Sequence, residues 1–245
     1  YSDGHVHLTK RANLQLRKLS GNGQQLTPEA LADIEATGLL PSKTHELVRN
    51  ILVSPQTGIV GGRMDLRPVV RRLDAALCAD PELARLPGRF LFTLDDGRGD
   101  LIQRLTGSGR GDSDLGLVAL GDDEVQLRVG GHWGEVVRFD EAAAHLAGLA
   151  AAFVVARGSG TEAPWHLREL PTPLRRPVAP DSRLPVPTQP LPHGVVPGGT
   201  HEHVPDGVLA PPQARRLLER VKASVAAVVV TPWHGIFVPH AEEAR

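Results

Sequence analysis

The sequence has little cysteine, few aromatic residues and almost no net charge. Of 245 residues one is cysteine, 4% are aromatic, and the formal net charge is −1. A lone cysteine, Cys78, excludes an internal disulfide and fits a reducing compartment, so we expect a cytoplasmic protein. A net charge near zero provides no field that favours nucleic acid or a membrane surface as partner. Any anion site must therefore come from a local group of basic residues.

Long apolar runs and a leader sequence are also missing. The purely apolar run at 225–230 is far too short to span a bilayer. No basic, apolar and small-residue leader follows Tyr1. The first residue is not methionine and a strand pattern starts at once, so we expect a piece cut inside a domain.

The stretch His5–Arg17 predicts two short strands joined around Lys10 and Arg11. Side chains alternate between the two faces of a strand, which puts Leu14 and Leu16 on a face suited to a core. The opposite face carries two guanidinium groups and two amides, from Arg11, Asn13, Gln15 and Arg17. This face suits a large anionic ligand, because guanidinium groups bind carboxylates in bidentate fashion. The open alternative is a sheet with a solvated polar face.

Apolar spacing predicts the remaining elements. Helices are expected over about 28–38, 66–78, 141–156 and 212–224, and strands at 51–53, 90–94, 117–120, 125–129, 226–231 and 236–238. Asp95-Asp96 and Asp122-Asp123 are expected to form turns. Nine of the 21 prolines lie in 171–197, where no apolar period is visible, so this segment is predicted to be an extended linker.

Two histidine pairs could bind a metal. His5 and His7 would share one face of a strand, which resembles the first-strand motif of amidohydrolases, but later strand ends supply no matching His or Asp. A plain solvent-facing strand is the alternative. His201 and His203 flank Glu202 beside the proline-rich segment, where a solvated polar loop is the simpler interpretation.

Three stretches together resemble the sirohaem-dependent sulfite and nitrite reductases. They are Thr9-Lys-Arg-Ala-Asn-Leu-Gln15, Arg49-Asn-Ile-Leu-Val-Ser-Pro55 and Leu86-Pro-Gly-Arg-Phe90. Within this superfamily the sequence is most similar to the precorrin-3B synthases of cobalamin biosynthesis. The stretches Asp74–Asp80, Gly88–Asp100 and Thr231-Pro232-Trp233 carry that finer resemblance.

The resemblance implies an enzyme whose arginines meet the carboxylates of a tetrapyrrole. The tetrapyrrole-binding residues carried over by match are Arg11, Asn13, Gln15, Arg49, Asn50 and Arg89. The reductases place two lysines after the Leu-Pro turn to bind the reducible anion, whereas this sequence has Arg89 and Leu91 there. This departure favours an oxidoreductase that converts precorrin-3A to precorrin-3B by O2-dependent ring hydroxylation and lactone formation. A sirohaem-dependent sulfite or nitrite reductase and a degenerate tetrapyrrole-binding module remain alternatives.

The resemblance also implies a [4Fe–4S] cluster held by four cysteines, and either sirohaem or non-haem iron in the full-length protein. Cys78 cannot supply four thiolates, so the cluster ligands are expected outside this chain, no metal ligand is assigned within it, and the chain alone is expected to be inactive. Ferredoxin or flavodoxin is the expected electron donor.

The expected fold class is α+β, with ferredoxin-like half-domains that flank a sulfite/nitrite-reductase-type α/β domain. The expected domains are an N-terminally incomplete half-domain at 1–47, the tetrapyrrole-binding domain at 48–170, the proline-rich linker at 171–197 and a C-terminally incomplete half-domain at 198–245.

Overall fold

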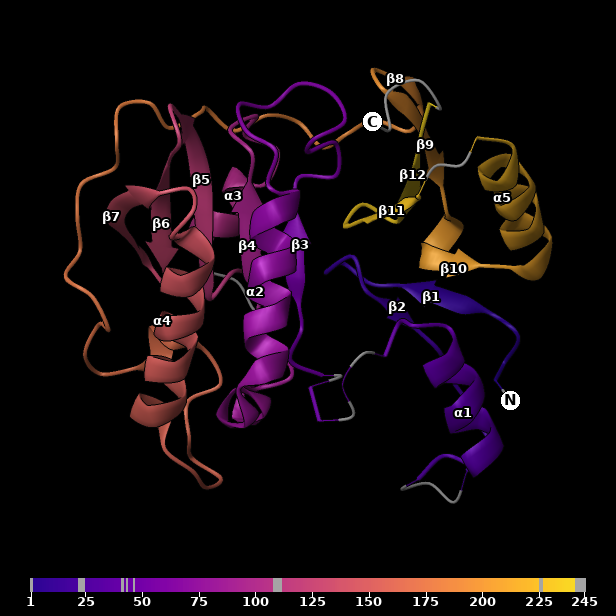
Figure 1. Ribbon diagram of the computed structural model, residues 1–245, viewed down its shortest axis with the longest axis horizontal. Helices are drawn as coiled ribbons and strands as arrows, with labels where there is room; N and C mark the ends of the chain where they lie inside the picture. Colours follow the sequence, from indigo (N-terminus) through magenta and orange to yellow (C-terminus); the bar gives the residue numbers. More distant parts are fainter. Residues whose placement is uncertain are drawn as a thin grey trace. The chain divides into compact units, whose positions relative to one another are not determined.

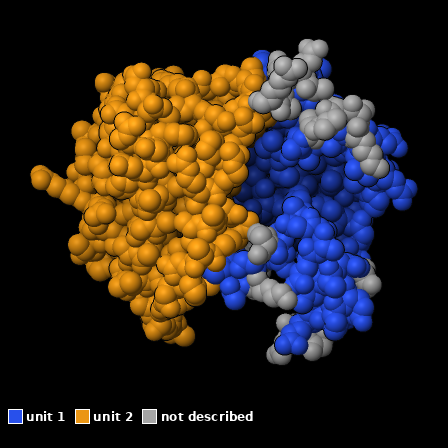
Figure 2. Space-filling model, in the orientation of Figure 1, with its two compact units in different colours: residues 1–46, 191–245 blue, residues 47–190 orange. Residues whose placement is uncertain are grey.

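The structure is a computed structural model, and it describes residues 2–21, 25–40, 42, 44–45, 47–107, 112–224 (without the side chains of 222–224) and 227–240. The chain divides into two compact units. Unit 1 combines residues 1–46 with 191–245, and unit 2 is the continuous stretch 47–190 (Figure 2). The boundaries of these units fall after residues 46 and 190, and the four domains expected from the sequence stay a prediction.

Unit 2 is built on one five-stranded sheet with the order β3-β4-β5-β6-β7 (Figure 1). Its strands are β3 (Ile51–Val53), β4 (Phe92–Asp95), β5 (Leu115–Gly121), β6 (Glu124–Val129) and β7 (His132–Arg138). The first three strands run parallel, and β6 and β7 continue the sheet in antiparallel fashion. The three parallel strands therefore begin at one edge of the sheet and end at the opposite edge.

Helices cover both faces of this sheet (Figure 1). The helices α2 (Arg67–Ala79) and α4 (Ala142–Arg157) pack on one face, and the short α3 (Ile102–Thr106) contacts β4 and β5 from the other. Alternation along β5 follows this layering, because Leu117 joins the core under α2 and α4 whereas Val118 contacts Ile102 and Leu105. Two short 3-10 helices, Pro81–Arg85 and Leu167–Glu169, follow α2 and α4.

The first part of the proline-rich segment is attached to unit 2. The Val178 N–H donates to the carbonyl of Trp133 on β7 at 2.9 Å. The Gln126 side chain on β6 donates to the carbonyl of Ala179 at 2.9 Å and accepts the N–H of Asp181 at 2.8 Å. A side-chain amide of the sheet therefore binds the backbone on both sides of Pro180.

In its described residues, unit 1 contains two smaller sheets and two helices. Its three-stranded sheet has the order β10-β1-β2, and its four-stranded sheet has the order β11-β12-β9-β8. The strands are β1 (Val6–Leu8), β2 (Leu14–Gln15), β8 (Gly194–Val196), β9 (Gly199–His203), β10 (Val208–Leu209), β11 (Val229–Thr231) and β12 (Gly235–Pro239); the helices are α1 (Pro28–Ala36) and α5 (Pro211–Ser224), and a 3-10 turn spans Pro205–Gly207. Strands β1 and β10 are antiparallel partners from opposite ends of the sequence.

Three details of unit 1 and unit 2 differ from the sequence-based expectation. Leu14 and Leu16 were expected in a core, but they are 45% and 38% exposed, because β2 is only two residues long and Ala12 at φ 58° interrupts the strand alternation. The segment 199–203 is a strand and not a solvated loop. Strand β7 was not predicted at all. Ala226, the expected start of a strand, lies outside the described residues.

Over the described ranges, every helix is too short or too polar to serve as a membrane span.

Candidate functional site

Three of the predicted ligand-binding residues lie at the edge where the parallel strands begin. Arg49 and Asn50 directly precede β3, and Arg89 lies three residues before β4. Because β3 and β4 are adjacent and parallel, these residues meet at one edge of the sheet. We call this side of the sheet, which the N-terminal ends of the parallel strands form, the amino edge.

The Asn50 side chain is buried and serves the backbone. Its amide nitrogen lies 3.1 Å from the carbonyl of Leu47, 3.2 Å from that of Gly88 and 3.1 Å from that of Phe90. A side-chain amide carries two N–H donors, which these three carbonyl oxygens share. Asn50 therefore fixes the turn that carries Arg89, and its role is to position that turn.

Arg49 is paired within unit 2. Its Nε lies 2.6 Å from Oδ1 of Asp74 on α2, and both side chains are partly exposed. Burial lowers the pKa of Arg49, but the bond to Asp74 and the neighbouring Cys78 more than offset this and raise it. Burial and the charge of Asp74 raise the pKa of the Cys78 thiol, which disfavours a thiolate there.

Arg89 is exposed and lines a cavity of about 350 Å³ together with Trp165, His166 and Glu169. Among the described residues, no hydrogen bond or ion pair holds its guanidinium group. Of the two arginines at the amino edge, Arg89 is thus the one with all its guanidinium donors available to a ligand, whereas Arg49 gives its Nε–H to Asp74.

His166 in the same cavity is held by a buried carboxylate. Asp114, 1% exposed, precedes β5 and so belongs to the amino edge. Its Oδ1 lies 3.2 Å from Nδ1 of His166, and its two oxygens accept the N–H groups of Leu91 and Leu167 at 3.0 and 2.9 Å. The hydrogen bond to Asp114 raises the pKa of His166, although burial opposes this. Sequence reasoning missed the pair, because its members are 52 residues apart and form no motif.

The predicted residues Arg11, Asn13 and Gln15 belong to unit 1. The hydroxyl oxygen of Thr9 accepts the N–H groups of Arg11 and Asn13, which closes the turn between β1 and β2. The side chain of Gln15 accepts both Nε–H and Nη2–H of Arg17 at 3.3 Å, so these two side chains share a face as expected. Convergence of Arg11 with the amino edge of unit 2 stays a prediction.

The opposite edge of the sheet, where β3 and β4 end, carries a network of carboxylates. Asp95 is buried and accepts the N–H groups of Gly97, Gly99 and Leu101, each at 2.9 Å, which confirms its role in a turn. Arg98 donates Nε–H and Nη2–H to the two oxygens of the buried Asp96 at 2.8 and 2.7 Å.

Asp100 completes this network through a hydroxyl relay. Ser54 at the end of β3 donates its hydroxyl to Oδ1 of Asp100 at 2.7 Å and accepts the N–H of Asp96 at 3.1 Å. Burial, and then the negative charge of Asp95, raise the pKa of Asp100 to about 7. Its carboxyl group therefore exchanges a proton near neutral pH.

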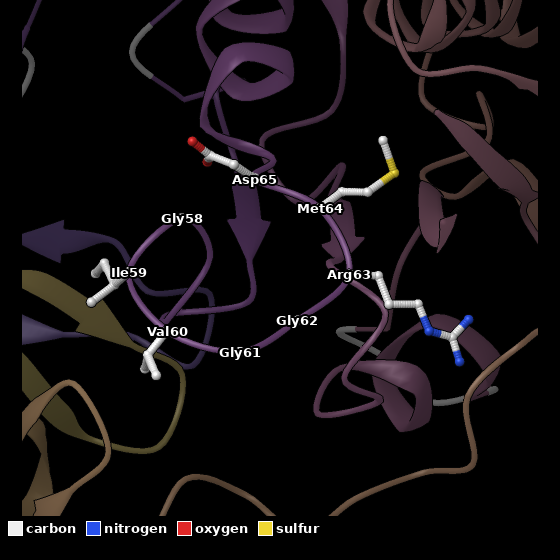
Figure 3. A pocket seen from close by; sticks show the side chains of 8 residues that line it. All are labelled: Gly58, Ile59, Val60, Gly61, Gly62, Arg63, Met64 and Asp65. Carbon is white, nitrogen blue, oxygen red and sulfur yellow. The ribbon is translucent and has the colours of Figure 1, made fainter. Parts of the chain in front are cut away.

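A glycine-containing loop lies beside this network. Residues 58–65 line a cavity of about 210 Å³, and Ile59 and Arg63 project from opposite sides of the loop (Figure 3). Gly62 has φ +72°, and a Cβ there would collide with the carboxylate of Asp96. Glycine at this position lets the backbone approach the buried carboxylate closely.

The histidine pairs make local contacts. Nε2 of His7 lies 3.0 Å from the Asp3 carboxylate, whose pKa this hydrogen bond lowers, and Nδ1 of His5 lies 2.9 Å from the Asp3 carbonyl. His201 is buried between the carbonyls of the segment before β8 and the hydroxyl of Thr231.

The residues of this chain do not fit the implied iron–sulfur cluster. A [4Fe–4S] cluster needs four thiolates, and the sequence has one cysteine. Within the described residues, no three His, Cys, Asp or Glu side chains form a group suited to a metal ion.

No protein-family model and no curated protein matches the chain. Among solved structures, its fold is similar to that of the Mycobacterium tuberculosis NirA protein, with a TM-score of 0.60 and 12% sequence identity. The similarity covers 98% of this chain and 49% of that one, so this chain spans about half the length of its structural neighbour. At this identity the similarity concerns the fold alone, and it confirms the predicted α+β class.

Proposed function

We propose that this chain is the tetrapyrrole-binding part of an oxidoreductase of the sulfite/nitrite-reductase type, and that the complete enzyme converts precorrin-3A to precorrin-3B. The observation that carries the proposal is the amino edge of unit 2, where two guanidinium groups, those of Arg49 and Arg89, precede neighbouring parallel strands. A corrin precursor is a flat ring surrounded by carboxylates, and such a rim requires several guanidinium donors.

Leu91 favours the synthase over the reductases. It occupies the place of the second anion-binding lysine, its side chain is fully buried, and its N–H is bound to Asp114. A buried leucine offers no charge to sulfite or nitrite. The tetrapyrrole would then be the substrate and dioxygen the oxidant in this cytoplasmic enzyme.

When bound in the complete protein, a [4Fe–4S] cluster and sirohaem or non-haem iron would supply the redox chemistry, with electrons from ferredoxin or flavodoxin. The part assigned to this chain is to hold the carboxylates of the ring. Arg11, Asn13 and Gln15 of unit 1 are proposed to join Arg49 and Arg89 in that role, whereas Asn50 acts through the turn before β4.

The proposal is tested by titrating precorrin-3A into the full-length protein and its variants. Each charge-assisted hydrogen bond contributes about 1.5–3 kcal/mol, so Arg11→Ala and Arg49→Ala are each expected to weaken binding more than about tenfold. Arg138→Ala is the matched control, because the Arg138 side chain is 63% exposed and pairs with Asp140 outside the amino edge.

Asp74→Asn separates ligand binding from folding at Arg49. It removes the negative charge that pairs with Arg49 but keeps an acceptor oxygen and the guanidinium group, so binding should be retained if Arg49 contacts the ligand. Unchanged affinity in both arginine variants would refute the assignment. Reduction of sulfite or nitrite by the full-length protein, without turnover of precorrin-3A, would favour the reductase.

A further inference from the structure

The geometry points to a pH-dependent carboxylate site in the cavity of Arg89, Trp165, His166 and Glu169, in which protonated His166 binds a carboxylate beside Arg89. This inference rests on the proposed function, since it names a second residue that would hold the acidic rim of the tetrapyrrole. The cavity volume of about 350 Å³ lies at the low end for ligand pockets, which suits one acidic side arm better than a whole macrocycle.

Asp114 determines which nitrogen of His166 is available. Both oxygens of Asp114 already accept backbone N–H groups, so its carboxylate acts only as an acceptor. Nδ1 of His166, 3.2 Å away, must then carry a proton and donate it to Asp114. The second nitrogen, Nε2, is left for the cavity, and it becomes an N–H donor when the ring is protonated.

The same carboxylate connects the two walls of the cavity. Leu91 lies two residues beyond Arg89, and Leu167 directly follows His166; the N–H groups of both leucines bind Asp114. One buried carboxylate thus holds the segments of Arg89 and His166 in a fixed relation. A site whose cations are positioned before the ligand arrives loses less entropy on binding.

The charges around His166 favour the protonated ring and leave Arg89 free. Asp114 and Glu169 favour the imidazolium form, whereas Arg168 opposes it; Arg89 lines the same cavity. One oxygen of Glu169 accepts the N–H groups of Trp165 and His166 at 2.7 and 3.2 Å, so this oxygen is bound to the backbone and not to Arg89. Trp165 is 54% exposed and offers a flat apolar surface at the rim.

The test uses two probes on the full-length protein, uroporphyrin and the small planar acid benzene-1,2,4,5-tetracarboxylate, at pH 6 and pH 8. Binding is followed by isothermal titration calorimetry. The wild-type protein is expected to bind both probes about tenfold more tightly at pH 6, because His166 is then charged. His166→Gln, which keeps a donor but does not titrate, should remove this difference. Arg89→Gln should weaken binding at both pH values.

His145→Gln on α4 is the matched control and should retain the pH dependence. The pKa of His166, read from its Cε1–H resonance and assigned with His166→Gln, should fall on Asp114→Asn if that variant folds. An unaltered pH dependence in His166→Gln overturns the inference even if uroporphyrin binds. If the small acid binds through His166 and uroporphyrin does not bind, the carboxylate site stands and the tetrapyrrole function fails.

Discussion

Unit 2 and unit 1 assemble their cores from differently distributed pieces of sequence. In unit 2 one continuous stretch folds over one sheet, and a single large apolar cluster runs from Val48 to Leu167. In unit 1 a smaller cluster joins Leu8 near one end of the chain to residues such as Val204 and Ile236 near the other. The difference shows where local sequence pattern is sufficient to specify structure, and it ranks the effects expected from mutation.

The largest effect is expected in the core of unit 2. Phe90 is fully buried, with ring centroids 5.2 Å from Phe92 and 5.1 Å from Phe153. Phe90→Ala should lower the free energy of unfolding of unit 2 by about 3–5 kcal/mol, because it leaves a cavity among aromatic rings. Urea denaturation followed by tryptophan fluorescence measures this loss.

The three tryptophans allow the two units to be followed separately. Trp133 and Trp165 report on unit 2, and Trp233 reports on unit 1. Leu217→Ala, in the smaller cluster, is the matched substitution and should cost about 2–3 kcal/mol in the Trp233 transition. If Phe90→Ala shifts both transitions equally, the units do not unfold independently and the comparison breaks down.

A smaller effect is expected from the turn after β4. Asp95→Asn replaces one acceptor oxygen by an NH2 group that faces a backbone N–H, and should destabilise unit 2 by about 2–3 kcal/mol. Asp122→Asn is the control. Asp122 lies exposed in the β5–β6 turn at φ 54°, a conformation that asparagine tolerates, so stability should change by less than about 0.5 kcal/mol. Equal stability of both variants would show that the buried carboxylate is dispensable.

The smallest expected effect is a pH response that differs in sign between the units. The pKa of Asp100 in unit 2 is raised to about 7, so the folded state binds a proton that the unfolded state releases near pH 4. Unit 2 therefore loses stability as the pH rises from about 4 to 7, because the unfolded state releases this proton more easily than the folded state does. Asp100→Asn should stabilise unit 2 at pH 8 by about 1–2 kcal/mol more than at pH 5, measured by urea denaturation.

His201 in unit 1 provides the opposite slope. Burial lowers its pKa, so the folded state resists a proton that the unfolded chain accepts below about pH 6.5, and stability is lost as the pH falls through that range. His201→Gln should reduce the loss of stability of unit 1 at acid pH, as followed by Trp233 fluorescence. The contrast between the units would be lost if Asp100→Asn and His201→Gln changed the pH dependence of stability in the same direction.

The sequence predicted most of unit 2 and less of unit 1. The helix at 66–78 and the hairpin around Gly121 have apolar patterns long enough to specify them. In unit 1 the two-residue strands β2 and β10 are too short to show a period, and β1 pairs with β10 some 200 residues away, on the order of the whole chain. The alternation that placed Leu14 in a core assumed a longer strand than the turn at Ala12 permits.

The candidate site was predictable to a similar extent. Resemblance indicated Arg49 and Arg89, and the parallel strands explain why they lie at one edge. Composition could not reveal that Asn50 is used by three carbonyl groups, or that Asp114 orients His166, because both facts depend on contacts between distant segments. The raised pKa of Asp100 likewise follows first from burial, which its sequence does not reveal, and only then from the charge of Asp95.

The antiparallel pair of β1 and β10 also constrains the order of events on the ribosome. Every strand of unit 2 has left the exit tunnel before Val208 and Leu209 are translated. Unit 2 can fold from its own local contacts while the nascent chain is still growing, as expected for a continuous segment. Strand β1 can pair with β2 early, but its other side must wait for β10, which is synthesised about 200 residues later, and until then it is exposed to chaperones and to neighbouring nascent chains.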